Sequence, residues 1–150
     1  MADKRLASLG RRMAKRATQL EKTAQGAVKA ATRAGLRTAI TTTPVATGNA
    51  KSNWNVSLRV PIITVIDNLK IGGSGAAGNF ARGRGLPIIN TFKLADGTMF
   101  ITNGVHYIRG LDDGTISSKG GFMSAKAVVA ANKALKAYLS KGVFVKGRKG

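Results

Sequence analysis

The sequence predicts an α+β fold: a small, mainly antiparallel β-sheet with a long N-terminal helix and a C-terminal helix packed on it. Two stretches with the apolar spacing of a helix, 1–42 and 124–140, enclose a middle part that contains alternating and glycine-rich segments. The 150 residues are enough for one domain with its own core. No internal repeat divides them, so we expect a single domain, 1–150.

The first predicted element is a long basic helix over residues 1–42. Asp3 is a candidate N-cap, and Thr43-Pro44 supplies the stop because proline disfavours helical backbone in the preceding residue. Apolar or small side chains recur at helical spacing at Leu6, Leu9, Met13, Ala17, Leu20, Ala24, Val28, Ala31 and Leu36.

The length and the glycines of this helix raise separate expectations. Gly10, Gly26 and Gly35 each cost about 1 kcal/mol relative to alanine inside a helix, so the first twenty residues are expected to fray or to order only on assembly. A continuous helix of this length would span ~60 Å, more than one small domain needs. Contact with a neighbouring subunit and packing on the chain's own sheet both remain open.

The sheet is expected within residues 52–103. Polar and apolar residues alternate from 53 to 60, which places Trp54, Val56, Leu58 and Val60 on one face, with Trp54 as a core anchor. Pro61 allows only an edge or a strand start for 62–66. Strands at 88–94 and 99–102 would flank a hairpin connection, 95–97.

Two further segments are expected to be irregular. Residues 67–86 contain six glycines (72, 73, 75, 78, 83 and 85) and no sustained periodicity, which predicts a flexible Gly-rich loop. The C-terminal helix, 124–140, would begin at Ser124 as N-cap and end before Gly142. A short strand at 143–145 and a basic tail, 141–150, complete the chain.

Several short motifs occur in a characteristic order. TPVATG (43–48) precedes the tryptophan-bearing strand NWNVSL (53–58), ITN…Y…LDDG follows within 99–114, and GGFM (120–123) opens the last helix. Asn103-Gly104 within the third motif predicts a turn. This order over residues 36–135 resembles the tail-completion, or neck, proteins of tailed bacteriophages. The tract TISSKGGFM lacks the proline usual in that family, and His106 stands where it usually has proline or an apolar residue.

The resemblance implies a structural virion protein at the phage head–tail joint. Several copies would form a homo-oligomeric ring, with a hexamer favoured over a dodecamer, around the channel through which DNA passes. The ring would contact a portal, or connector, or a head-completion protein on one side and a tail protein on the other. Such a protein is made in the host cytoplasm and ends in the virion.

The charge of the chain points to an anionic partner. Its 25 Lys and Arg against 6 Asp and Glu give a net charge of +19, which favours nucleic acid, an acidic protein ring or anionic lipid. Solvated basic helix faces explain the same composition. The alternative function is therefore binding of nucleic acid without sequence preference by a small basic protein. Against it, the eight aromatic residues of this chain form no interleaved basic–aromatic patch in the sequence.

The candidate contact residues for a polyanion or a neighbouring subunit fall in three places. The Gly-rich segment has Arg82 and Arg84, which we expect to become ordered against DNA or an adjoining ring. Lys15, Lys22 and Lys29 recur every seven residues and form one basic stripe on the first helix. The tail adds the remaining candidates, Lys146, Arg148 and Lys149.

Catalytic, metal and membrane functions find little support in the sequence. The absence of cysteine removes thiolate chemistry and cysteine-based metal sites, and a single histidine, His106, cannot build a zinc site without carboxylates. Asp112 and Asp113 are expected to serve a turn or a helix cap. GGSGAAG (72–78) lacks the Lys-Ser/Thr of a phosphate loop. We therefore predict no enzymatic activity, no cofactor and no membrane span.

Overall fold

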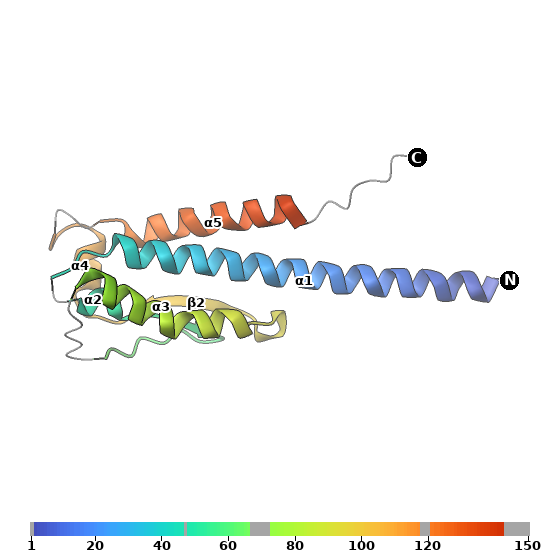
Figure 1. Ribbon diagram of the computed structural model, residues 1–150, viewed down its shortest axis with the longest axis horizontal. Coiled ribbons are helices and arrows are strands. Elements are labelled where there is room, and N and C mark those ends of the chain that lie inside the picture. The colour runs from blue at the N-terminus through green and yellow to red at the C-terminus, as the bar shows by residue number, and fades with distance from the viewer. Residues whose placement is uncertain (1, 47, 67–72, 118–120, 143–150) are drawn as a thin grey trace.

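The computed structural model confirms the α+β fold, with a two-stranded antiparallel sheet, a long N-terminal helix and a C-terminal helix packed on that helix (Figure 1). It describes residues 2–46, 48–66, 73–117 and 121–142. In chain order, these residues form α1 (Ala2–Thr42), α2 (Asn49–Ser52), β1 (Trp54–Leu58), α3 (Ser74–Thr91), the short 3₁₀ helix η1 (Leu94–Asp96), β2 (Met99–Asn103), α4 (Ile108–Asp112) and α5 (Met123–Gly142).

Helix α1 divides into a packed half and a protruding half. It is continuous over 41 residues and ends where Pro44 was expected to end it. From Thr23 onward one side is buried, with Leu36, Ala39 and Ile40 in the main core. Its N-terminal half extends beyond every other described element (Figure 1). The excess length predicted from the sequence is therefore present as a projecting helix.

Two glycines of α1 lie at close contacts with other elements, Gly26 with α5 and Gly35 with β2. A Cβ atom added at Gly26 would lie 2.0 Å from the Tyr138 hydroxyl oxygen, and one at Gly35 would lie 3.0 Å from Ile101 Cδ1. The two helices run side by side over much of α5 (Figure 1). Glycine lowers helix propensity at these positions, and at the same positions its small size makes room for side chains of α5 and β2.

Strands β1 and β2 form one hairpin-like pair although a long segment connects them. Trp54 pairs with Asn103 and Leu58 with Met99. The predicted alternation holds for Trp54 and Val56, which are buried against α1 and α3 in the main core. Val60, which the pattern placed on the same face, lies after the strand and is exposed.

Residues 60–66 cover the opposite face of β1 without forming a strand. The Ser57 hydroxyl donates to the Val60 carbonyl at 2.7 Å, and the Ile66 amide donates to the Asn53 side-chain oxygen at 2.8 Å. The prediction of a strand at 62–66 was therefore wrong. Backbone groups of residues 60–66 form hydrogen bonds with side chains of residues 53–57, and these two segments form no ladder of backbone hydrogen bonds.

The prediction of a loop over 67–86 was wrong for its described part, because Ser74–Thr91 is the helix α3. Its buried positions include Ala77, Gly78, Ala81 and Gly85, whose small size lets the helix lie close to α1 and β1. The predicted strand at 88–94 was wrong for the same reason, since most of it belongs to α3. The connection at 95–97 joins a helix to β2, through η1 and Gly97 with a φ of 77°. Residues 67–72 lie outside the described residues.

Helix α5 confirms the predicted C-terminal helix, with a different start. It begins at Met123, and Ser124 is its second residue. Both the amide and the hydroxyl of Ser124 donate to the Asp112 carboxylate, the amide at 2.9 Å. Asp112 thus caps the N-terminus of α5, although it lies 12 residues before Ser124 in the sequence. A helix cap was one of the two roles expected for the acidic pair. The strand at 143–145 and most of the tail lie outside the described residues.

Candidate functional site

The motif segments meet at the end of the molecule where α1 finishes. Ala50, Leu111 and Met123 form a second buried cluster, and Tyr107 packs against it. These residues come from the segment after TPVATG, from the Tyr107–Asp113 segment and from the start of α5. Segments that are far apart in the sequence therefore build one structural unit.

Hydrogen bonds tie these segments together. Trp54 donates its indole N–H to the Thr43 hydroxyl at 2.8 Å, and Thr43 donates in turn to the Ala39 carbonyl at 2.6 Å. The Asn103 side-chain amide donates to the Ala50 carbonyl at 2.7 Å. The first motif is thereby fastened to the end of α1 and to β1, and the helix α2 that follows it is fastened to β2.

Gly104 has a different role from the predicted one. It does not adopt the positive φ that an Asn-Gly turn would use. A Cβ atom at this position would lie 1.8 Å from the Ile63 carbonyl oxygen. Glycine is required here because the backbone of residues 60–66 passes against it.

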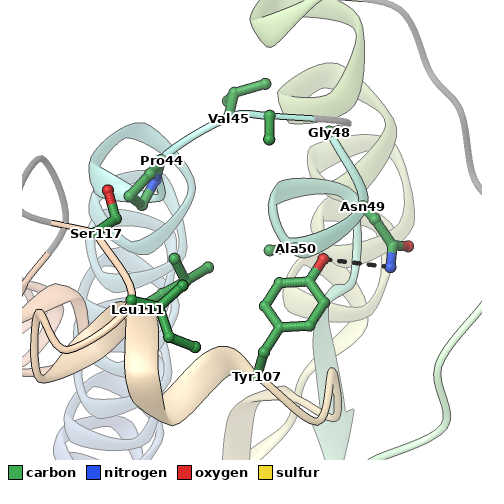
Figure 2. Close-up of a pocket in the computed structure, with 10 residues that line it drawn as sticks. Pro44, Val45, Gly48, Asn49, Ala50, Tyr107, Leu111 and Ser117 are labelled. Carbon is green, nitrogen blue, oxygen red and sulfur yellow. Dashed lines mark hydrogen bonds between the residues drawn. The ribbon is translucent and has the colours of Figure 1, made fainter.

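An apolar cavity of about 480 Å³, called the motif pocket here, opens between the motif segments (Figure 2). Its lining includes Pro44, Val45 and Ala50 from the first motif and α2, and Tyr107, Leu111 and Ile116 from the segment around α4. The Asn49 side chain donates to the Tyr107 hydroxyl in a long hydrogen bond of 3.5 Å. This volume is within the range of about 300–1,000 Å³ that ligand pockets occupy.

Asp113 is exposed and lies in the sequence between two residues of the pocket lining, Leu111 and Ile116. Thr115 donates to its carboxylate through the backbone amide at 3.0 Å and through the hydroxyl at 2.8 Å. These hydrogen bonds hold the pKa of Asp113 below its ordinary value. The turn role expected for the acidic pair is confirmed at Asp113.

A shallow basic groove lies between α1 and α3. Arg33 and Arg37 of α1 line it together with Arg82 of α3, and Leu36 and Leu86 form its apolar part. The sequence interpretation selected Arg82 but missed the two arginines of α1. Their i, i+4 spacing on one helix face was the available signal.

Arg82 and Arg84 do not form one contact site. They lie two residues apart on a helix, so their side chains point in different directions. The Arg84 guanidinium carbon lies 5.4 Å from the centre of the Phe80 ring, and its Nη1 is buried without a hydrogen-bond partner among the described residues. The expectation that both arginines belong to one Gly-rich loop was wrong, because that segment is helical.

Lys51 is a buried cation that the sequence interpretation missed. Its side chain is only 6% exposed, and its Nζ donates to the Ser74 hydroxyl at 2.8 Å. Burial, and after it the positive charge of Arg82, lower the pKa of Lys51. Lys51 therefore adds positive charge beside the first turn of α3.

The three lysines of the basic stripe on α1 differ in their surroundings, because Lys29 is bonded to α3 whereas Lys15 and Lys22 are exposed. Lys29 donates its Nζ to the Asn90 carbonyl at 2.8 Å, and Arg33 donates to the Asn90 side-chain oxygen at 2.5 Å. A cation near the C-terminal carbonyls of a helix is favourable, so Lys29 stabilises the end of α3. Lys15 and Lys22 are exposed on the projecting half. Lys146, Arg148 and Lys149 lie outside the described residues.

Other chemistry is sparse in the described part of the chain. One ion pair, Arg59–Asp96 at 3.5 Å, forms there, and no group of three or more His, Asp or Glu side chains is placed to hold a metal ion. None of the helices described is both long and apolar enough to cross a bilayer. His106 packs edge-on against Tyr107 with ring centres 5.0 Å apart.

Comparisons with protein-family models, curated proteins and solved structures found no match to this chain.

Proposed function

We propose that this chain is a structural ring protein at the head–tail joint of a tailed bacteriophage, a neck or tail-completion protein around the DNA channel. The observation that carries the proposal is the convergence of the motif segments in one unit around Ala50, Leu111 and Met123. A fold shared with that family requires the motif segments to converge, and this convergence therefore supports the proposal.

The proposed ring is a homo-oligomer, hexameric rather than dodecameric, between a portal or head-completion protein and a tail protein. The projecting half of α1 offers a surface for contacts between subunits (Figure 1). The charge of +19 favours acidic neighbours, and it opposes assembly of free copies until such a neighbour is present. The protein would be made in the host cytoplasm and incorporated into the virion.

Loss of the protein should separate heads from tails. If the gene is inactivated in the phage that carries it, we expect DNA-filled heads and free tails in the lysate, visible by electron microscopy. Supplying the intact chain from a plasmid should restore joined particles. Quantitative mass spectrometry of purified virions should find about as many copies as a closed ring contains. One or two copies per particle, or normal particles without the gene, would contradict the proposal.

The alternative is a basic protein that binds nucleic acid without sequence preference, and the basic groove of Arg33, Arg37 and Arg82 favours it. A neck ring should hold passing DNA weakly, because tight binding to phosphates would slow ejection. The free protein is therefore expected to bind duplex DNA weakly and to lose it near physiological salt.

A salt titration separates these functions. Each phosphate contact contributes roughly 0.9 to the slope of log affinity against log salt, so changing Arg33, Arg37 and Arg82 to alanine should flatten the slope by up to about 2.7. The matched control removes the same charge from exposed positions of α5, Lys126, Lys133 and Lys136. Fluorescence anisotropy measures both variants. Tight binding that survives ~200 mM salt, or a preference for one sequence, would favour the alternative.

A further inference from the structure

The projecting half of α1 carries an apolar row that no described residue covers. Leu6, Leu9 and Met13 are 66%, 47% and 62% exposed, and nearly all side chains from 4 to 22 are exposed with them. Their spacing puts the three on one face of the helix. Exposure of apolar surface to water is unfavourable, so this row has the character of a contact surface.

Arginines border this row. Arg5, Arg12 and Arg16 follow one another at i, i+7 and i+11, so they run along one side of the apolar row. Lys15 lies on the opposite side of the helix from Leu6 and about 120° around it from Leu9. A partner for this surface must therefore combine an apolar recess with negative charge at its rim.

The opposite end of the same chain offers these features. The motif pocket is lined mainly by apolar groups, and Ile116 of this lining is 60% exposed. Asp113, two residues from Leu111 of the lining, is exposed and receives hydrogen bonds from Thr115. Asp96, by contrast, is paired with Arg59.

We propose that the N-terminal half of α1 docks head to tail on a second copy of this chain, with Leu6, Leu9 and Met13 at the motif pocket and the neighbouring arginines beside Asp113. The two surfaces lie at opposite ends of the molecule, so one copy can use both at once (Figure 1). A head-to-tail contact of this type closes into a ring when its rotation permits. The inference rests on the proposed ring function and names the surfaces that would build the ring.

The chain lacks cysteine, which permits a direct test by disulfide trapping. Full-length Leu9→Cys and Ile116→Cys proteins are mixed and oxidised at ~0.3 M salt, which shortens the range of their mutual repulsion to well below 10 Å. Both positions are exposed, so the changes should not affect folding. The control mixture pairs Ile116→Cys with Lys15→Cys, because a disulfide needs Cα atoms within about 7 Å.

The mixed Leu9–Ile116 product should exceed the control product by about tenfold, and neither variant alone should form as much dimer. Adding Asp113→Asn, which keeps an oxygen for Thr115 but removes the charge, should lower the yield several-fold. Equal yields in the two mixtures would overturn the inference. As much dimer from Leu9→Cys alone as from the mixture would also overturn it, because this indicates pairing of two α1 helices.

A lipid surface is the competing occupant of the apolar row. If vesicles with anionic headgroups protect Leu9→Cys from alkylation whereas added wild-type protein does not, the row belongs to lipid and the inference fails. The proposed function is judged separately by the virion copy number. Many copies in the virion without the mixed disulfide would reject only this interface, and the disulfide without copies in the virion would reject the ring at the head–tail joint.

Discussion

Replacing Trp54 with alanine is expected to lower the free energy of unfolding by about 3–5 kcal/mol. The side chain is 7% exposed and belongs to the main core, which also contains Leu36 and Val56. Its indole N–H donates to Thr43, the residue that follows α1. The change therefore leaves a cavity and also detaches the TPVATG segment from β1. Urea denaturation followed by far-UV circular dichroism measures the loss.

Two matched variants separate the parts of this effect. Trp54→Phe keeps an aromatic ring in the core and loses the N–H donor. Thr43→Val keeps the side-chain volume and leaves the buried indole N–H without its acceptor, which should cost about 1–3 kcal/mol. A loss below about 1 kcal/mol for Trp54→Ala would show that the core tolerates removal of this ring.

The sequence predicted correctly those parts of the fold in which burial of one face alone produces the periodicity of apolar residues. In the second half of α1 the apolar spacing follows a single buried side that includes Leu36, and in β1 the alternation places Trp54 and Val56 in the core. Strand β2 was expected at 99–102 and is found at Met99–Asn103. These elements needed no knowledge of what lies far away in the sequence.

Helix α3 was missed because its glycines have a tertiary purpose. Gly78 and Gly85 are buried in the helix, at positions where larger residues would meet Ile40, Leu36 and Val56. Glycine and proline both have low helix propensity, so the glycines and Pro87 of this segment indicated that it is not a helix. Packing of a small face against α1 and β1 depends on residues distant in sequence, so no local pattern reveals it.

Only part of the candidate site was predicted, because the rest also depends on contacts between residues distant in sequence. The motifs were recognised in sequence, yet the pocket that they enclose depends on how α1, α2 and α4 meet. Arg82 was selected as if it shared a loop with Arg84, whereas the helix directs it toward Arg33 and Arg37. Lys29 was assigned to a free basic stripe, and its bond to Asn90 was not visible in the pattern.

Substitution of Gly85 by leucine is expected to destabilise the protein by at least about 1–3 kcal/mol, the usual cost of overpacking a core. A Cβ atom alone would lie 2.7 Å from Leu36 Cδ2 and 2.9 Å from Val56 Cγ2, and the rest of the leucine side chain needs still more room. Helix α3 would have to move away from α1 and β1, which would also displace Arg82 from the basic groove.

Gly83 provides the control in the same helix. No atom lies within 4 Å of a Cβ added there, so Gly83→Ala should stabilise the protein by about 0.5–1 kcal/mol through its higher helix propensity. Chemical denaturation of the two variants should give changes of opposite sign. If both positions tolerated larger residues equally, the segment would be a loop, as glycine content alone indicates, and α3 would not be packed against the core. Opposite signs require the close approach that Gly85 allows.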